Sequence, residues 1–183
     1  MKSLPAIALC GLLAGLTSIQ AAEDPVARSS PDGSMSVKNV GDSAAAGAHF
    51  QIVSCNGDVL LASDKHPDLK SGSFADRIFW SKDSRYVAFS VRTSGPYIRD
   101  TFVYSTQSKH LLLIPTAEDD SQTSPVCWHD ARTLIVQTRA PFGGKATEDT
   151  AMASYRYRRT FRFSESPLRL QKLYTSPRSH PKP

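Results

Sequence analysis

The sequence predicts an all-β protein built from about three antiparallel sheet modules. Short apolar segments with period-two alternation recur along the chain, and clusters of Gly, Pro, Asn, Asp and Ser separate them. One turn motif also recurs at intervals of roughly 50 residues, which is the size of a four-stranded repeat. With 183 residues, the chain is long enough for one domain with a sizeable core.

The amino terminus has the pattern of an export signal. Lys2 precedes an uncharged, leucine-rich run, and Ala21 and Ala22 follow this run before the first acids. This order is typical of a secretory signal peptide over residues 1–21, with cleavage after Ala21 or after Ala22. We therefore expect a periplasmic or secreted protein whose all-β domain covers residues 22–175. The basic, proline-containing segment 176–183 is expected to be a disordered tail.

The remaining composition restricts the expected partners. The formal net charge is +5, with acids interspersed among the cations, which favours solubility more than a nucleic-acid partner. The longest apolar run after the leader, Leu111 to Ile114, is far shorter than the ~20 residues of a membrane span. Cys55 and Cys127 remain after the leader. They could form a disulfide in an oxidising compartment or stay as two buried free thiols, since spacing does not decide between these alternatives.

The first module follows the Pro31-Asp32-Gly33 turn. Weak alternation predicts a strand over 35–40. Segments 48–54 and 58–62 predict a hairpin, because Asn56-Gly57 tolerates the left-handed conformations of a tight turn.

The central module, from Asp76 to Pro115, contains the clearest strand pattern. Turn residues divide it into four predicted strands, over 77–80, 85–92, 97–104 and 110–114. In the second of these strands, alternation predicts a core face of Val87, Phe89 and Val91 and an opposite face of Tyr86, Ala88 and Ser90.

The third module begins after an acidic connection over 116–124. Its predicted strands cover 126–128, 133–138, 151–163 and 168–174, with a polar loop over 143–150 between the second and the third.

Five residues of the repeated turn are predicted to be structural. Asp32, Asp83 and Asp130 align at separations of 51 and 47 residues, and Trp80 and Trp128 precede the second and third of them. An Asp in such a turn can accept hydrogen bonds from backbone N–H groups ahead of it, while a Trp buries a large ring between stacked sheets.

The segments Ser30 to Gly33, Trp80 to Phe89 and Trp128 to Val136 resemble the blade-opening motif of TolB-type, WD40-like β-propeller repeats, W-S-P-D-G followed by an apolar strand. The first copy lacks the Trp, and the third lacks Pro and Gly in its turn. The resemblance implies a propeller-like fold that serves as a periplasmic binding scaffold or as an accessory domain of peptidases. The motif marks the fold and not a catalytic site.

Three modules are fewer than the ~4 to 8 blades that usually close a propeller. Two chains could complete one ring as a homodimer, the repeats could form a partial propeller with covered edges, or the modules could fold into a compact β-sandwich. We expect three stacked sheets or a sandwich-like form rather than closure by dimerisation.

A search for catalytic chemistry gives few candidates. The sequence has no nucleophile elbow, phosphate loop or paired-His zinc motif, and we predict no cofactor and no metal site. His129 beside Asp130 could form half of a triad, although Asp130 already has a predicted turn role. Asp64, His66 and Asp68 alternate and could hold a cation, although flanking lysines favour an ordinary solvated loop.

The most distinctive surface candidate is the segment 155–163. In a strand, Arg156, Arg158 and Arg162 share one face with Thr160, while the aromatic residues and Arg159 share the other face and pack. The arginine face is either a solvated surface that resists edge-to-edge aggregation or a contact for an anionic partner. Such a partner could be a cell-envelope polymer, a lipid headgroup or an acidic protein surface.

Together, these observations predict an exported, non-enzymatic binding module whose candidate binding residues are Arg156, Arg158 and Arg162. The expected partner is a protein or an anionic component of the cell envelope. The alternative is a divergent hydrolase or peptidase-accessory domain that uses His129 and an unidentified Ser.

Overall fold

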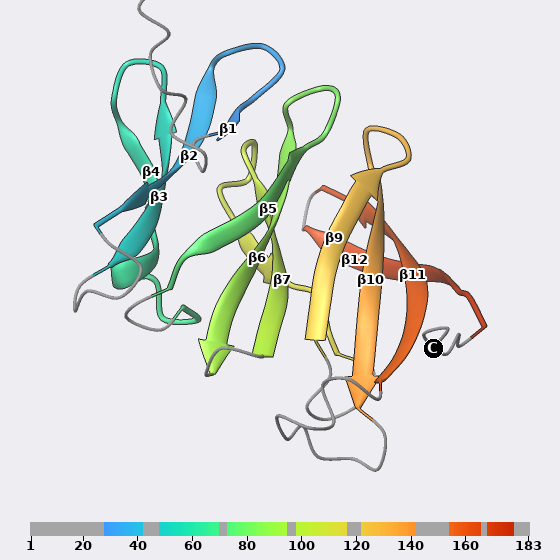
Figure 1. The fold of residues 1–183 in the computed structure, drawn as a ribbon. Coiled ribbons are helices and arrows are strands. Elements are labelled where there is room, and N and C mark those ends of the chain that lie inside the picture. The colour runs from blue at the N-terminus through green and yellow to red at the C-terminus, as the bar shows by residue number, and fades with distance from the viewer. Residues whose placement is uncertain are drawn as a thin grey trace, which may run out of the picture.

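In the described part of the chain, three four-stranded antiparallel sheets and one short 3₁₀ helix make up the structure, a computed structural model. In each sheet the four strands are adjacent in chain order, so every sheet is a simple meander (Figure 1). The predicted all-β class with three antiparallel modules is therefore confirmed. The structure describes residues 28–41, 48–69, 73–94, 98–116, 122–141, 154–165 and 168–177.

The first sheet contains β1 (Arg28–Ser29), β2 (Met35–Val40), β3 (His49–Ser54) and β4 (Val59–Ala62). The predicted hairpin is present as β3 and β4, and Gly57 in its turn adopts a φ of 90°. The 3₁₀ helix η1 (Ser63–Lys65) follows β4. The Ser63 hydroxyl accepts a hydrogen bond of 2.9 Å from Phe50 N, which attaches this connection to β3.

The second sheet contains β5 (Ala75–Trp80), β6 (Tyr86–Ser94), β7 (Ile98–Ser105) and β8 (Leu111–Leu113). All four strands lie within two residues of the predicted positions. An irregularity interrupts the pairing of β5 with β6 between Asp76 and Phe79, where Arg77 takes a positive φ of 49°.

The third sheet contains β9 (Gln122–Trp128), β10 (Thr133–Pro141), β11 (Ser154–Ser164) and β12 (Arg169–Thr175). Strand β9 begins within the segment that the sequence predicts to be an acidic connection. Its polar residue Thr123 is fully buried, and its hydroxyl accepts a 2.7 Å hydrogen bond from Thr101 N of the second sheet, which offsets the cost of burying it. Burial of a polar side chain that is hydrogen-bonded to another sheet cannot be predicted from a pattern of apolar residues.

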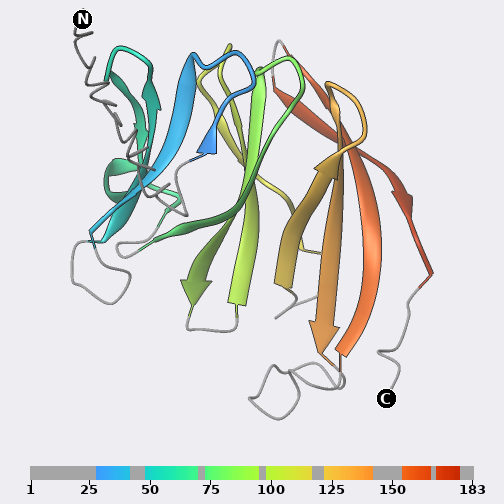
Figure 2. The ribbon, with the colours of Figure 1, turned by 45° about the horizontal axis from the view of Figure 1, so that its top comes forward.

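The sheets are stacked with the second between the first and the third (Figures 1 and 2). An apolar core joins the first and second sheets, and in it Phe50 and Phe89 meet edge to face with ring centroids 5.0 Å apart. A second core joins the second and third sheets around Val103, Leu134 and Phe161. Burial of these side chains supplies the main driving force for stacking, at about 25 cal/mol per Å² of apolar surface.

Strand β6 is buried on both of its faces. Val87, Phe89 and Val91 are buried as predicted, and they pack toward the first sheet. The opposite face of Tyr86 and Ala88 packs against the third sheet and is equally buried. The prediction of a single core face is therefore wrong. Period-two alternation distinguishes the two faces of a strand but does not show that a middle sheet has neighbours on both sides. Burial also raises the pKa of the Tyr86 hydroxyl to about 12.

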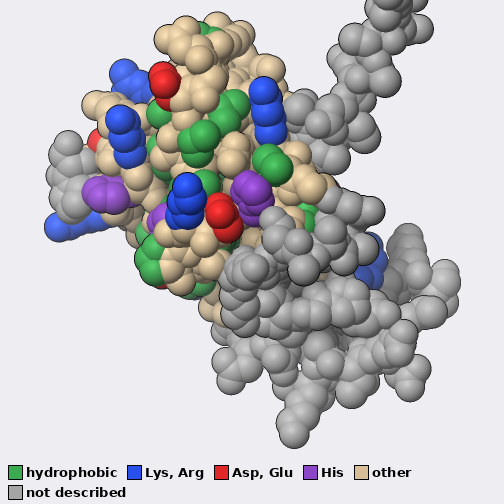
Figure 3. Space-filling model, turned by 90° about the vertical axis from the view of Figure 1, so that its left-hand side faces the viewer, with side chains coloured by type: hydrophobic (Ala, Val, Ile, Leu, Met, Phe, Trp, Pro, Cys, Tyr) green, Lys and Arg blue, Asp and Glu red, His purple; other side chains and the backbone are tan. Residues whose placement is uncertain are grey.

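The stack is open, since the sheets do not close into a barrel. Figure 3 views the molecule from the side on which the first sheet lies, and hydrophobic side chains there are scattered among Lys, Arg, His and acidic side chains. Val40 and Val59 of the first sheet are 38% and 52% exposed. This surface is mixed in character, unlike the buried interfaces inside the stack.

The predicted leader and all of the predicted tail beyond Pro177 lie outside the described residues. Among the residues that the structure does describe, no helix has the length and apolar character needed to cross a membrane.

Candidate anion-binding face of the third sheet

Strand β11 places its side chains alternately inside and outside the stack. Arg156, Arg158 and Arg162 are exposed, whereas Tyr157 and Phe161 between them are buried. The three arginines therefore share the outer face of the third sheet, which no other described sheet covers (Figure 2). We call this surface, defined by Arg156, Arg158 and Arg162, the arginine face.

The neighbouring strand β10 adds polar side chains to the arginine face. In the register of β10 and β11, Gln137 lies opposite Arg158, and Arg139 lies opposite Arg156. Directly opposed residues of antiparallel strands point to the same side of a sheet. Partial burial lowers the pKa of Arg139, and the positive charge of Arg156 lowers it further. Two like charges are thus held close together at one end of the face.

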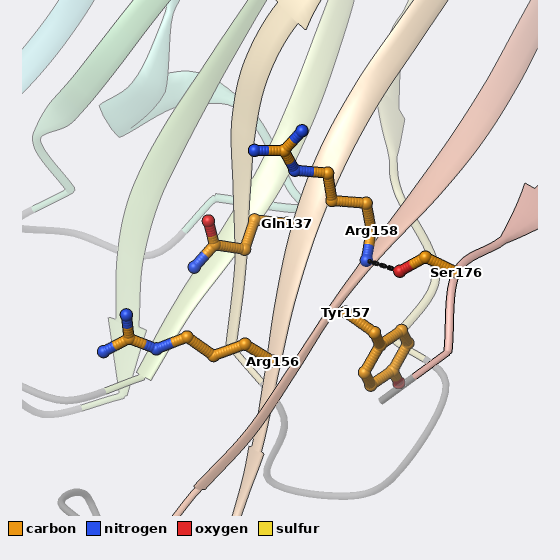
Figure 4. Close-up of a pocket in the computed structure, with 5 residues that line it drawn as sticks. All are labelled: Gln137, Arg156, Tyr157, Arg158 and Ser176. Atoms are coloured by element: carbon orange, nitrogen blue, oxygen red, sulfur yellow. Dashed lines mark hydrogen bonds between the residues drawn. The ribbon is translucent and has the colours of Figure 1, made fainter. Parts of the chain in front are cut away.

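An open hollow of about 340 Å³ lies on this end of the face, lined by Gln137, Arg156, Tyr157, Arg158 and Ser176. Figure 4 shows that the side chains of Gln137, Arg156 and Arg158 project to one side of the sheet while the Tyr157 ring lies on the other. Ser176 is held by two hydrogen bonds of 2.8 Å, because Arg158 N donates to its hydroxyl and its own N–H donates to Arg158 O. The edge of the hollow is therefore fixed to β11.

The charged residues of the third sheet are mostly positive. Its described strands and turns contain two acids, Asp130 and Glu165, and both lie in turns. The same residues include eight cations: Arg132, Arg139, Arg156, Arg158, Arg159, Arg162, Arg169 and Lys172. A concentration of positive charge of this kind attracts anions and raises their local concentration.

Arg159, which the sequence assigns to the packing face, is 2% exposed. Its Nε donates to the Thr138 hydroxyl at 2.8 Å, its Nη1 donates to Pro115 O at 2.6 Å, and its guanidinium carbon lies 5.1 Å from the centre of the Phe161 ring. Burial lowers its pKa. Arg159 therefore links the second and third sheets and is not accessible to a partner.

The three aspartates of the repeated turn each make the same type of hydrogen bond. The carboxylates of Asp32, Asp83 and Asp130 each accept from the backbone N–H two residues ahead, at 3.0, 3.3 and 2.7 Å. The Asp32 carboxylate also accepts from the hydroxyls of Ser30 and Ser34, and these hydrogen bonds hold its pKa far below the usual range. The hydrogen bond from Arg132 N likewise lowers the pKa of Asp130.

The two tryptophans connect successive sheets in the same way. Trp80 Nε1 donates to Arg28 O of the first sheet at 3.0 Å, and Trp128 Nε1 donates to Phe79 O of the second sheet at 2.9 Å. Trp128 also packs against Tyr86 and Phe163, with ring centroids 5.6 Å away in both cases. Each Trp thus attaches its own sheet to the first strand of the preceding sheet.

The remaining candidates are dispersed. His129 is exposed, its backbone N–H donates to Thr133 O at 2.8 Å, and the described part of the chain records no hydrogen bond between its imidazole and a hydroxyl. His66 Nδ1 lies 3.8 Å from Asp68 Oδ2. No group of three or more His, Cys, Asp or Glu among the described residues is placed to hold a metal ion.

The disulfide considered from the sequence is not formed. Cys55 and Cys127 are both free and exposed. Cys55 lies in the turn between β3 and β4 of the first sheet, whereas Cys127 lies on β9 of the third sheet, so the second sheet separates them. The burial expected for free thiols is also not found.

Sequence reasoning found the arginines of β11 but missed the residues that complete the outer surface. Gln137, Arg139, Ser176 and Arg169 join it from other strands or turns. Their contribution depends on strand register, which a single strand pattern does not determine.

The fold and this surface define a stack of three four-stranded antiparallel sheets with a basic outer face. No protein-family model matches the chain, and no curated protein matches its sequence. Among solved structures, the chain is similar to Kuenenia stuttgartiensis hydrazine synthase, with 13% sequence identity and a TM-score of 0.45 over 80% of this chain and 41% of that chain. The chain therefore spans less than half the length of that protein.

Proposed function

We propose that this protein is an exported, non-enzymatic binding module that uses the arginine face to hold an anionic component of the cell envelope. The observation that carries the proposal is the alternation of β11, which exposes Arg156, Arg158 and Arg162 on a face where the described residues of the strands include no acid. If the arginines of β11 served only to keep a solvated strand from aggregating, the neighbouring strands would not have to add further cations to the same surface. Here Arg139 and Arg169 do so.

The same proposal gives the repeats the role of a propeller-like scaffold of the TolB type. The shared Asp hydrogen bond and the repeated Trp link support this assignment, because both recur from one sheet to the next. The leader-like segment 1–21 supports export to the periplasm or beyond. A non-catalytic role agrees with the position of His129, the residue of the hydrolase alternative, which is exposed and lies in a turn.

The test is retention on defined polyanions. Purified protein is passed over immobilised polygalacturonate, dextran sulfate, polyphosphate and poly-glutamate, with neutral dextran as the blank. Retention on at least one polyanion is expected, and the variant carrying Arg156→Glu, Arg158→Glu and Arg162→Glu should bind it at least about tenfold more weakly. Binding should also weaken as salt is raised, because exposed charges are screened.

A matched control separates the arginine face from net charge. Lys38, Lys65 and Lys82 are exposed and lie in the first two modules, so their triple change to Glu alters the net charge by the same amount. This control should retain most of the binding. Equal losses in the two triple variants, or no retention of the wild-type protein on any polyanion, would refute the proposal.

A further inference from the structure

A second hollow lies at the opposite end of β11 from the first. It has a volume of about 430 Å³, and three arginines line it: Arg132, Arg162 and Arg169. Ser164 and Gln171 complete its polar lining. We call it the three-arginine hollow.

Three different elements supply the three guanidinium groups. Arg132 comes from the turn between β9 and β10, Arg162 from the end of β11, and Arg169 from the start of β12. Their convergence follows from strand pairing, since Thr133 next to Arg132 lies opposite Arg162, and Ser164 lies opposite Arg169. The site therefore rests on the sheet itself and not on one long loop.

The two acids nearest to this hollow in the chain both accept hydrogen bonds from groups other than the guanidinium groups of the lining arginines. The Asp130 carboxylate accepts from the backbone N–H of Arg132 at 2.7 Å, and Glu165 Oε1 accepts from the Ser105 hydroxyl at 2.7 Å. The described part of the chain records no ion pair for Arg132, Arg162 or Arg169. All three side chains are exposed, so they can turn toward a ligand.

The chemistry of the three arginines that line this hollow indicates the kind of anion that it would bind. Each guanidinium presents a fork of N–H donors that matches two oxygens of an oxyanion. A carboxylate has two oxygens and one negative charge, so it satisfies one fork well. A phosphate ester carries about −1.5 to −2 charges and three free oxygens, which can serve several forks at once.

We propose that the three-arginine hollow is a distinct site for a tetrahedral oxyanion, a phosphate or sulfate ester group. The inference rests on the proposed function, because it names the chemical group that the basic surface holds. Arg162 belongs both to this hollow and to the arginine face, and it lies four residues from Arg158, or about 14 Å along the strand. An extended chain of such esters reaches both hollows, whereas a single free oxyanion occupies one.

Two double variants test the site, each removing two positive charges. Arg132→Gln with Arg169→Gln changes the lining of the three-arginine hollow and none of the residues that line the opposite hollow, and Arg156→Gln with Arg158→Gln does the reverse. Calorimetric titration with pyrophosphate at constant ionic strength should show at least a tenfold loss of affinity in the first variant and less than a threefold loss in the second. Acetate at the same ionic strength should bind far more weakly than pyrophosphate to the wild-type protein.

Long-chain polyphosphate distinguishes whether the tetrahedral oxyanion belongs to a polymer or to a small free molecule. Tighter binding than pyrophosphate, reduced by either double variant, indicates a polymer that spans both hollows. Equal binding indicates a small free oxyanion at the three-arginine hollow, which also supports the site. Thermal melting of each variant checks that it is folded, since surface substitutions of this kind usually change stability little.

Equal losses of pyrophosphate binding in the two double variants, or equal affinity for acetate and pyrophosphate, would overturn the three-arginine hollow while leaving the general polyanion proposal intact. Pyrophosphate binding that depends on Arg132 and Arg169, in a protein that no polyanion column retains, would instead support the hollow and overturn the proposed function.

Discussion

At the scale of single residues, the two tryptophan links are chemically alike but differ in their surroundings. Trp128 donates to Phe79 O from a partly buried position and packs against two aromatic rings. The hydrogen bond from Trp80 to Arg28 O is exposed to solvent, although the Trp80 ring is itself partly buried against the first core. A hydrogen bond shielded from water is harder to replace, because solvent cannot reach the carbonyl that is left without its donor.

We therefore expect Trp128→Phe to destabilise the protein more than Trp80→Phe. Loss of the Trp128 donor should cost about 1 kcal/mol, which lowers Tm by roughly 2–4 °C for a domain of this size. Trp80→Phe is the matched control, since it removes the same indole N–H, and it should change stability by about 0.5 kcal/mol or less. Thermal melting followed by circular dichroism measures both. Equal costs, or a larger cost at Trp80, would contradict the link assigned to Trp128.

The arginines of β11 show what the sequence can predict at this scale. Exposure of Arg156, Arg158 and Arg162 followed from period two alone, because one aromatic face had to be buried. The same rule placed Arg159 on the packing face. It did not identify the carbonyl of Pro115 and the hydroxyl of Thr138 that bind its guanidinium, since these acceptors lie 44 and 21 residues away in the chain.

At the scale of elements, β6 belongs to the middle sheet of the stack, and both of its faces are buried. Val87 is fully buried against the first sheet, and Ala88 is fully buried against the third. A strand buried on both faces tolerates a charge on neither of them, because an unpaired buried carboxylate has lost its hydration.

Val87→Glu and Ala88→Glu should therefore both be strongly destabilising, each by at least about 3 kcal/mol. Lys38→Glu, at an exposed strand position on β2, is the control and should be nearly neutral. Urea denaturation midpoints and soluble yield measure the effect. Tolerance of Ala88→Glu beside failure of Val87→Glu would restore the single core face that the sequence predicted.

The strands were predictable wherever apolar alternation and turn residues agreed. The hairpin of β3 and β4 and all four strands of the second sheet fall close to their predicted positions. The start of β9 was missed because Gln122, Thr123 and Ser124 are polar, and Thr123 is buried by a hydrogen bond to another sheet. The composition of the arginine face was likewise incomplete, since strand register brings Gln137 and Arg139 beside β11.

At the scale of the whole molecule, the two ends of the stack are chemically different. The described residues of the third module carry eight cations and two acids, while those of the first module carry three cations and four acids: Arg28, Lys38 and Lys65 against Asp32, Asp58, Asp64 and Asp68. Inside the stack, by contrast, apolar side chains join the sheets. The sequence predicted three modules, but it could not predict which faces would be covered, because every sheet has an alternating pattern.

This difference bears on whether two chains complete one ring. A six-sheet ring would cover the outer face of the third sheet and so remove Arg156, Arg158 and Arg162 from water. Desolvation costs several kcal/mol per ion unless each charge gains a well-placed partner. The first module has too few acids on its strands to provide such partners, because its four described acids lie in turns and connections.

We therefore expect one chain per particle in sedimentation velocity, both at low salt and at physiological ionic strength. Changing Arg156, Arg158 and Arg162 together to Leu removes the desolvation cost and creates an apolar face, so this variant should associate or aggregate. The matched change of Lys38, Lys65 and Lys82 to Leu, which lie away from the third sheet, should associate less. A stable wild-type particle of two chains that persists at both salt concentrations would contradict the expectation, and it would show that charge on the third sheet does not limit ring closure.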